Sequence, residues 1–509
     1  MRRRGIATLF ILVCTFVVGA PAALAHGPAT VRVRTSDELI AAMIAANASG
    51  RPTVIRIAPG TYQFTQMFPN ERGPSWLPPV TGTMALVAHD AAQTILSGNT
   101  EFARLLTVTA SGALLVRGVT VTQGRAFCIG SELCAESGGG AALNAGGILW
   151  LEDCVIDQNG AFPFTFGGAI ESTGGHLFVS NAEVTRNSVS EGGGGGIAVL
   201  DGRARIWRST LGGNLVNFFT GNSSVAGGGL YIRNGTVWIE RSSVSGNRLG
   251  NQPDAGVSGS GAGIFNLAGT LHLVRSAVTE NSSPIPTGQF APLPGTGGGI
   301  HNRGQLSVID STIGANVIGS AGGGLANGGT AYLEGVTVAR NEVLGILDQF
   351  GDFQGCIPDP DPARPICHPT GGGIWNEERT PGTIHIARSI VALNVIPAVG
   401  ARSPDCGATL ISDGVNAIGN TADCTLQKSP GAGPDLLNVN PRLGDLDDNG
   451  DSGEAHFPVL AGSPVIDAGG RIGKLCSFRD QLGNRRVDGD KDGKVECDIG
   501  AIEFQSPRH

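Results

Sequence analysis

Side chains that could contact a sugar recur at one position of a repeated sequence pattern. The third residue after the first glycine of successive copies is Trp150, Phe178, Arg205, Trp238, His272, Ser307, Tyr332 and His385. Aromatic residues make up only 5% of the chain, so their concentration here is a distinct signal. Flat rings in a row suit stacking against the apolar C–H faces of sugars. The pattern predicts a glycan-binding stripe formed by Trp150, Phe178, Trp238 and Tyr332. The alternative is that these rings only stack on one another or lie beneath a neighbouring loop.

A second group of residues near the C-terminus has the spacing of a calcium loop. Carboxylates occupy loop positions 1, 3 and 5, and Gly493 occupies position 6, where such loops make a sharp turn. Position 12 is Ile499 rather than glutamate, but an aspartate one residue earlier could substitute. The expected calcium ligands are Asp488, Asp490, Asp492 and Asp498. The alternative is a solvated acidic turn held by Cys476 and Cys497.

Residue sets typical of catalysis are not evident in the sequence. A polysaccharide lyase needs a lysine or arginine base beside groups that neutralise a uronate carboxylate, and the repeats contain no lysine. An outward column of arginines is expected from Arg208, Arg241, Arg275 and Arg388. Because Glu240 lies beside Arg241, ordinary solvated ion pairs are the favoured interpretation of this column. No Ser-His-Asp set, zinc-ligand cluster or suitably spaced carboxylate pair stands out. No catalytic residue is therefore assigned.

The element that must position these side chains is a 13-residue repeat, which occurs nine times between Gly112 and Asn394. Its plainest copy runs from Gly269 to Asn281 and alternates apolar with polar residues in two short stretches. This alternation has the period of two that is typical of β-strands. Units of this kind bury an apolar core only when they stack. The predicted fold is an all-β, right-handed, single-stranded parallel β-helix.

Two sets of asparagines are expected to stack from coil to coil and to satisfy buried turns. One set ends the copies of the repeat: Asn159, Asn187, Asn214, Asn247, Asn281, Asn316, Asn341 and Asn394. The other follows glycine-rich segments: Asn144, Asn234, Asn266, Asn302, Asn327 and Asn376. Cys154 occupies a small inward position that serine or alanine fills in other copies, so it is expected to be a buried core residue and not a nucleophile.

Composition and the N-terminus restrict the cellular setting. The net charge of −8 excludes a basic stripe for nucleic acid. A basic start, an apolar run and an Ala-x-Ala site predict a signal peptide over residues 1–25, cleaved after Ala25. No later stretch is long and apolar enough to span a bilayer. The protein is expected to be secreted or displayed on the cell surface, and its oligomeric state stays open.

Cysteine spacing in an oxidising compartment suggests local disulfides. Four close pairs are candidates: Cys128 with Cys134, Cys356 with Cys367, Cys406 with Cys424, and Cys476 with Cys497.

The remaining sequence divides into three parts. Residues 26–80 combine a helical pattern with a first strand and are expected to cap the solenoid end. Residues 81–426 form the β-helix, with variable insertions leaving one corner, where recognition loops commonly lie. Residues 427–509 are rich in Asp, Gly and Pro.

The last part resembles the choice-of-anchor Q domain, a tail module that follows right-handed β-helices in exported bacterial proteins. The resemblance rests on four stretches: Leu443–Gly450, Leu460–Gly469, Asp480–Gly483 and Cys497–Glu503. The family usually has arginine where Leu482 stands, so an ion pair made there would be missing. The resemblance implies an exported protein with the pectate-lyase-like fold. The expected function is a non-enzymatic, adhesin-like module that binds glycan or cell surfaces; the alternative is a carbohydrate-active enzyme, a lyase or hydrolase, with its site in the corner loops.

Overall fold

The computed structural model describes residues 27–99, 101–127, 136–217, 225–250, 259–283, 295–344, 371–377, 381–397, 404–448, 450–471, 476–489 and 493–505. The predicted signal peptide lies outside these ranges. So do two of the predicted disulfides, Cys128 with Cys134 and Cys356 with Cys367.

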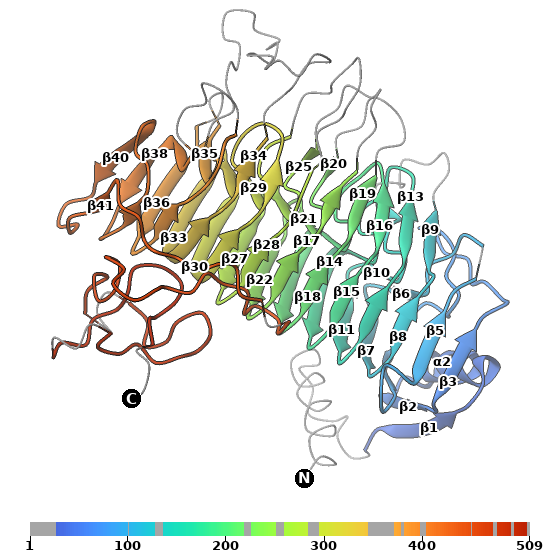
Figure 1. Cartoon of the computed structure of the whole chain (residues 1–509). Helices are drawn as coiled ribbons and strands as arrows, with labels where there is room; N and C mark the ends of the chain where they lie inside the picture. Colours follow the sequence, from blue (N-terminus) through green and yellow to red (C-terminus); the bar gives the residue numbers. More distant parts are fainter. Residues whose placement is uncertain are drawn as a thin grey trace, which may run out of the picture.

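The chain folds into a long stack of short strands that all run parallel to their neighbours in the ladder, as the period-two repeat predicts (Figure 1). The long strands pair from one end of the stack to the other: β1 (Ala29–Val33), β2 (Thr53–Ile57), β4 (Thr83–Val87), β7 (Ala113–Arg117), β11 (Ile148–Glu152), β14 (Ile170–Ser180), β17 (Ile197–Trp207), β22 (Thr236–Glu240), β27 (Thr270–Val274), β30 (Gln305–Gly314), β33 (Thr330–Ala339), β36 (Thr383–Ala387), β38 (Cys406–Ser412) and β40 (Cys424–Lys428). This series is called the long-strand ladder below.

Short strands form the other sides of each coil. Before the long strand come β6 (Leu106–Val108), β10 (Ala142–Asn144), β21 (Leu230–Ile232), β26 (Ile264–Asn266), β29 (Ile300–Asn302), β32 (Leu325–Asn327) and β35 (Ile374–Asn376). After it come β3 (Gly60–Gln63), β5 (Thr94–Ser97), β8 (Thr120–Thr122), β12 (Val155–Asp157), β15 (Glu183–Thr185), β18 (Thr210–Gly212), β23 (Ser243–Ser245), β28 (Ala277–Thr279), β37 (Ile390–Ala392), β39 (Ala417–Ile418) and β41 (Leu436–Leu437).

Small separate sheets lie at the corners of the coils. One comprises β9 (Arg125–Phe127), β13 (Gly160–Phe162), β16 (Ser188–Ser190), β19 (Leu215–Asn217) and β24 (Arg248–Leu249). Two further pairs are β20 (Val225–Ala226) with β25 (Gly259–Ser260), and β31 (Val317–Ile318) with β34 (Glu342–Val343).

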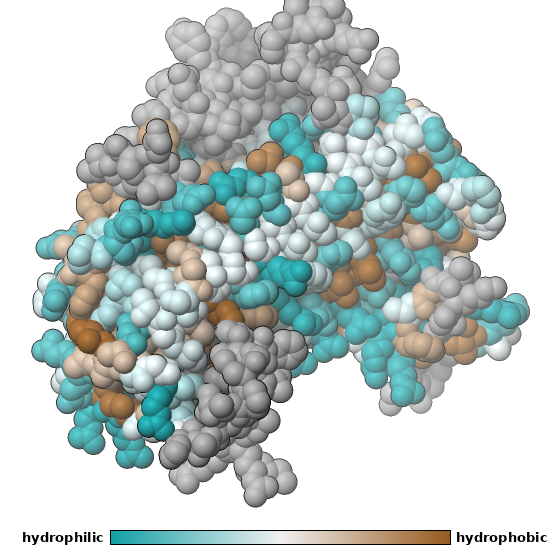
Figure 2. Space-filling view, turned by 180° about the vertical axis from the view of Figure 1, so that it is seen from behind, coloured by the Kyte–Doolittle hydropathy of each residue, from teal (hydrophilic) through white to brown (hydrophobic). Residues whose placement is uncertain are grey.

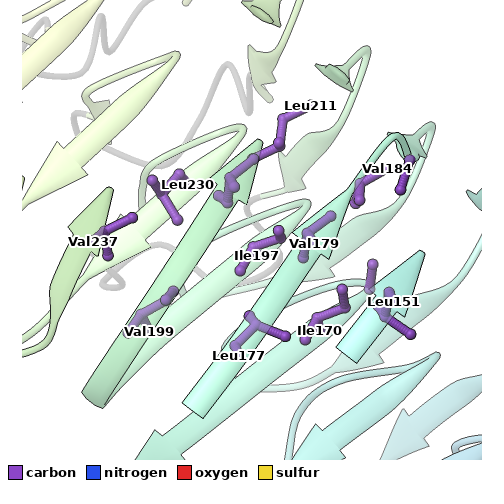
Figure 3. Packing of buried hydrophobic residues seen from close by; sticks show 14 of the residues in the cluster. Leu151, Ile170, Leu177, Val179, Val184, Ile197, Val199, Leu211, Leu230 and Val237 are labelled. Carbon is purple, nitrogen blue, oxygen red and sulfur yellow. The ribbon is translucent and has the colours of Figure 1, made fainter. Parts of the chain in front are cut away.

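The core is a continuous apolar column inside the stack. In the plainest copy, Leu271, Leu273 and Val278 are fully buried, while His272 between them points outward because side chains alternate along a strand. Figure 3 shows equivalent leucine, isoleucine and valine side chains from successive coils lying in rows one above another. Each coil therefore completes the core of its neighbours, as the repeat requires.

The helix α2 (Ser36–Ser49) closes the N-terminal end of this core. Thr35 caps the helix by accepting the amide of Glu38 at 3.2 Å, an arrangement that satisfies a free backbone donor. Leu39 and Met43 are fully buried and join the same apolar column as Ile55. The helix expected from the sequence is therefore present, over Ser36–Ser49.

The first set of asparagines forms the predicted ladder. All eight are buried, and the Nδ2 of Asn281 donates to the Oδ1 of Asn316 at 2.9 Å. Asn247 in turn donates to Asn281 at the same distance. The second set stacks only in part: Asn266, Asn302, Asn327 and Asn376 bond in sequence. The placement of Asn234 in that set is wrong, because Asn234 is exposed and Ile232 is the residue in register with Asn266.

The C-terminal segment folds back against the side of the solenoid (red in Figure 1). Gly453 donates its amide to Ser243 Oγ at 2.7 Å, and Gln481 accepts a hydrogen bond from Thr312 Oγ1 at 2.7 Å. A further anchor is Arg486, whose fully buried guanidinium contacts Asp310 at 3.1 Å and Glu503 at 2.9 Å. The tail therefore makes polar contacts with coils far away in the sequence, and it also shares a buried apolar cluster with them.

Candidate functional site

The predicted stripe is a continuous column on the outer face of the long-strand ladder. Residues of the stripe are direct register partners from coil to coil: Trp150 with Phe178, Phe178 with Arg205, Arg205 with Trp238, Trp238 with His272, His272 with Ser307, Ser307 with Tyr332, and Tyr332 with His385. Neighbouring strands lie about 4.8 Å apart. Trp150, Trp238 and Tyr332 therefore recur every three coils, roughly 14 Å apart along the rod.

The rings of this column form three pairs in contact, two of them stacked and one tilted. Trp238 and His272 lie 5.6 Å apart and nearly parallel, and Tyr332 and His385 lie 4.8 Å apart. Trp150 and Phe178 are tilted against each other at 5.5 Å. The rings do stack on one another, as the structural interpretation of the stripe expects.

Exposure differs between the members of the column. Trp238 and Tyr332 are 38% and 50% exposed, so much of each ring remains open to solvent. Trp150 and Phe178 are half-buried, and Trp150 also donates its indole N–H to Ser180 Oγ at 3.1 Å. The outer faces available for a ligand are thus mainly those of Trp238 and Tyr332. On the face drawn in Figure 2, hydrophobic residues form separate small patches between hydrophilic ones.

The acidic loop near the C-terminus is described only at its ends, because Asp490 and Asp492 lie outside the described residues. Asp488 accepts the amide of Gly493 at 2.9 Å. Asp498 is fully buried, and its two oxygens accept the amides of Asp467 and Phe504. Burial raises the pKa of Asp498 to about 7, with a further contribution from the nearby Glu503. Within the described ranges no three His, Cys, Asp or Glu residues lie close enough to hold a metal ion, so calcium stays a prediction.

Two predicted disulfides are present and the isolated cysteine is buried. Cys406 bonds to Cys424 and Cys476 bonds to Cys497. Cys154 is a free thiol inside the core, 1% exposed. Burial raises its pKa to about 12, which keeps it a thiol and argues against a nucleophilic role.

Sequence reasoning missed one group of polar side chains at the corner of the coils. Thr296 Oγ1 lies 3.0 Å from His301 Nδ1, and His301 Nε2 lies 2.7 Å from Glu377 Oε1. Arg303 Nε donates to the same carboxylate oxygen at 2.9 Å. Because a carboxylate only accepts, the proton belongs on Nε2, and Nδ1 accepts the hydroxyl of Thr296. A hydroxyl, an imidazole and a carboxylate therefore lie in line.

The burial of this group determines its charge. His301 is 1% exposed, and burial lowers its pKa. Burial opposes ionisation of Glu377 as well, but hydrogen bonds from His301 and the charge of Arg303 outweigh it and lower its pKa to about 2. The sequence did carry a signal: His301 precedes one stacked asparagine and Glu377 follows another. The pairing of His301 with Glu377 was missed because one coil lies between theirs. That coil has only Ala326 and Gly328 on either side of its stacked asparagine.

The outward arginine column is only partly solvated. Arg388 is 3% exposed and bonds to Glu334 at 2.8 Å, so the expectation of a solvated pair is wrong there. Glu240 pairs with Arg205 at 3.1 Å, which lies on the same face of the sheet. Arg208, Arg241 and Arg275 line a hollow of about 340 Å³ beneath the tail segment 451–454.

Comparisons with known proteins find no match for this chain, whether among family models, curated proteins or solved structures. In the part of the chain that the structure describes, no helix has the length and apolar composition of a membrane span.

Proposed function

We propose that this chain is an exported, right-handed parallel β-helix protein that binds glycan along the aromatic column, as an adhesin-like module. The observation that carries the proposal is the column itself, in which Trp150, Trp238 and Tyr332 recur at intervals of three coils. A linear polysaccharide laid along the rod would meet these rings one after another. Rigid strands hold the rings in place, which lowers the entropic cost of binding.

Export and the nature of the tail are parts of the same proposal. The signal-peptide pattern of residues 1–25 and the disulfides Cys406–Cys424 and Cys476–Cys497 support an oxidising compartment. The motifs of residues 427–509 support a choice-of-anchor Q-like tail, although no family model matches it. In this proposal the tail braces the side of the rod, and the aromatic column on the long-strand ladder makes the contact.

Retention of the full mature chain on insoluble neutral polysaccharides tests the proposal. The variant Trp238→Ala/Tyr332→Ala should lose about 1–3 kcal/mol of binding for each stacked ring, with little change in melting temperature because both rings are exposed. Phe478→Ala is the matched control, since Phe478 is 72% exposed and belongs to the tail and not to the long-strand ladder. Equal retention of both variants and wild type would refute the glycan proposal. A large loss of melting temperature in the double variant would assign the rings to structure.

A second candidate function is a carbohydrate-active enzyme with its site at the corner of the coils. The line of Thr296, His301 and Glu377 favours it, because the imidazole is oriented to take the hydroxyl proton of Thr296. Release of reducing ends or of ester-linked groups from polysaccharides would be the readout. Thr296→Val and Glu377→Gln should each abolish it, whereas Thr383→Val, at an exposed threonine, should not. Product formation that survives both changes would exclude this group as the site.

A further inference from the structure

A hollow of about 340 Å³ lies between the side of the solenoid and the docked tail. Its inner wall consists of Arg208, Arg241 and Arg275, and its outer wall consists of the tail segment 451–454 with Gln481 and Leu482. The three arginines directly follow register partners on three successive strands of the long-strand ladder. Since adjacent strands are about 4.8 Å apart, the three residues lie within roughly 10 Å of one another along the rod.

The backbone of these arginines adopts the left-handed region. Their φ angles are 46°, 48° and 48°, a conformation that glycine and asparagine adopt more readily than arginine. The equivalent residue is Asn181 in the coil before Arg208, and Gly335 in the second coil after Arg275. A corner that only has to turn is therefore served by smaller residues elsewhere in the same row. Three consecutive arginines at this position point to a use for their side chains.

Within the described residues, no ion pair balances the positive charges of this wall. Arg275 Nε is buried there without a hydrogen-bond partner. The guanidinium of Arg208 lies over the ring of Trp207, 4.5 Å from its centroid. Like charges on neighbouring strands repel each other, and a buried donor without a partner is unfavourable. A negatively charged group in the hollow would relieve both.

The opposite wall carries negative charge. Asp451 and Glu454 line the hollow from the tail side. Gly453, between them, donates its amide to Ser243 Oγ at 2.7 Å, which fixes this turn of the tail on the solenoid. Leu482 adds an apolar side chain to the same wall. The hollow therefore presents arginines on one side, carboxylates on the other, and an apolar surface beside them.

We propose that this hollow binds a small zwitterion with a phosphate group at one end and an ammonium group at the other. The phosphate faces the arginines, which bind phosphate oxygens through paired N–H donors. A phosphate ester has three terminal oxygens for three arginines, whereas a carboxylate has only two. The ammonium group faces Asp451 and Glu454, and a short hydrocarbon linker contacts Leu482. The volume of the hollow is that of a small-molecule site.

Titration calorimetry of the full mature chain with O-phosphoethanolamine tests the proposal, beside two fragments of that probe, ethyl phosphate and ethanolamine. Arg241→Gln/Arg275→Gln should weaken binding of both phosphates by at least about tenfold, because charged hydrogen bonds are lost. The control Arg125→Gln/Arg485→Gln removes the same charge at exposed sites and should bind both as wild type does. Ethanolamine alone should not bind measurably.

A second variant tests the acidic wall and leaves the arginines in place. Asp451→Asn/Glu454→Gln should weaken binding of O-phosphoethanolamine about threefold, to the level of ethyl phosphate, because partly exposed charge pairs are individually weak. Binding of ethyl phosphate should not weaken in this variant. The site is separate from the aromatic column, so Trp238→Ala/Tyr332→Ala should bind O-phosphoethanolamine as wild type does even if it no longer retains glycan.

Other results would overturn the proposal. Equal affinities of the wild-type protein for O-phosphoethanolamine and ethyl phosphate would show that the acidic wall takes no part. Equal affinities of the arginine variant and its control would place phosphate binding elsewhere. If the arginine variant does not fold, unchanged binding of O-phosphoethanolamine by the acidic-wall variant rejects the site. Arginine-dependent binding of phosphatidylethanolamine vesicles without binding of the soluble probe would assign the arginines to a membrane surface instead.

Discussion

Asn394 donates both its side-chain Nδ2 and its backbone amide to a single oxygen of Asp405, at 2.9 and 3.0 Å. Asp405 occupies the place of the next asparagine, and its other oxygen accepts the amide of Asn420 at 2.7 Å. The ladder of asparagines therefore ends on a carboxylate, which accepts hydrogen bonds without needing a further partner above it. Burial raises the pKa of Asp405, although these three donors oppose the shift.

The interior of this ladder should tolerate substitution poorly. Asn281→Leu removes the acceptor of both the amide and the side chain of Asn247, and each buried donor left unpaired costs about 1–3 kcal/mol. We expect the free energy of unfolding to fall by at least that amount in chemical denaturation. Asn234→Leu is the matched control, because Asn234 is exposed, and should change it by less than about 0.5 kcal/mol. Equal midpoints for the two variants would show that the ladder does not stabilise the fold.

The part of the fold that repeats could be predicted, and the part that occurs once could not. Alternation along a strand places Leu271 and Leu273 inside and His272 outside whatever the neighbouring coils contain. The contacts of Arg486 follow no such rule. Its partner Asp310 is 176 residues away, and the pair does not recur in a way that would show from the sequence that the two residues meet. The prediction for Asn234 failed for a related reason. Aligning the copies by residue type alone does not show that Ile232, two residues earlier, occupies the asparagine position in that coil.

Docking of the tail should depend on the buried guanidinium of Arg486. Arg486→Met would leave Asp310 and Glu503 as buried carboxylates without their cation, a loss of about 3–5 kcal/mol. We expect earlier proteolysis of the tail and a lower unfolding midpoint, with the solenoid core retained. Arg485→Met, at the adjacent exposed arginine, should leave both unchanged. A stable, protease-resistant tail in Arg486→Met would mean that its other contacts, such as that of Gln481 with Thr312, suffice.

The group formed by His301 and Glu377 should make stability fall in acid. The pKa of Glu377 is lowered in the folded protein. Its contribution to the free energy of unfolding is therefore complete above about pH 4.5, the ordinary pKa of a glutamate, and is lost as the pH falls toward about 2. The pKa of His301 is also lowered, so the unfolded chain takes up this proton first and stability declines once the pH drops below about 6.5. Denaturation midpoints from pH 7 to pH 3 should therefore fall less steeply for Glu377→Gln/His301→Gln than for wild type. Parallel curves would show that neither group titrates differently on unfolding.

Calcium should stabilise the tail if the acidic loop binds it. Asp488, Asp490 and Asp492 place three carboxylates within five residues, and their mutual repulsion would be relieved by a cation. Asp498 is already occupied by two backbone amides, so the site would take its remaining ligands from loop carbonyls or water. Weak extracellular sites have affinities of roughly 0.1–1 mM, and several times that concentration stabilises the bound form by about 1 kcal/mol.

Thermal unfolding in calcium and then in excess chelator measures this difference. Asp490→Asn/Asp492→Asn should abolish it, whereas Glu101→Gln/Asp423→Asn, which removes equal charge at exposed positions, should retain it. If calcium does not raise the melting temperature of wild type, or raises it equally in the loop variant and in the control variant, the loop is only an acidic turn beside the Cys476–Cys497 disulfide.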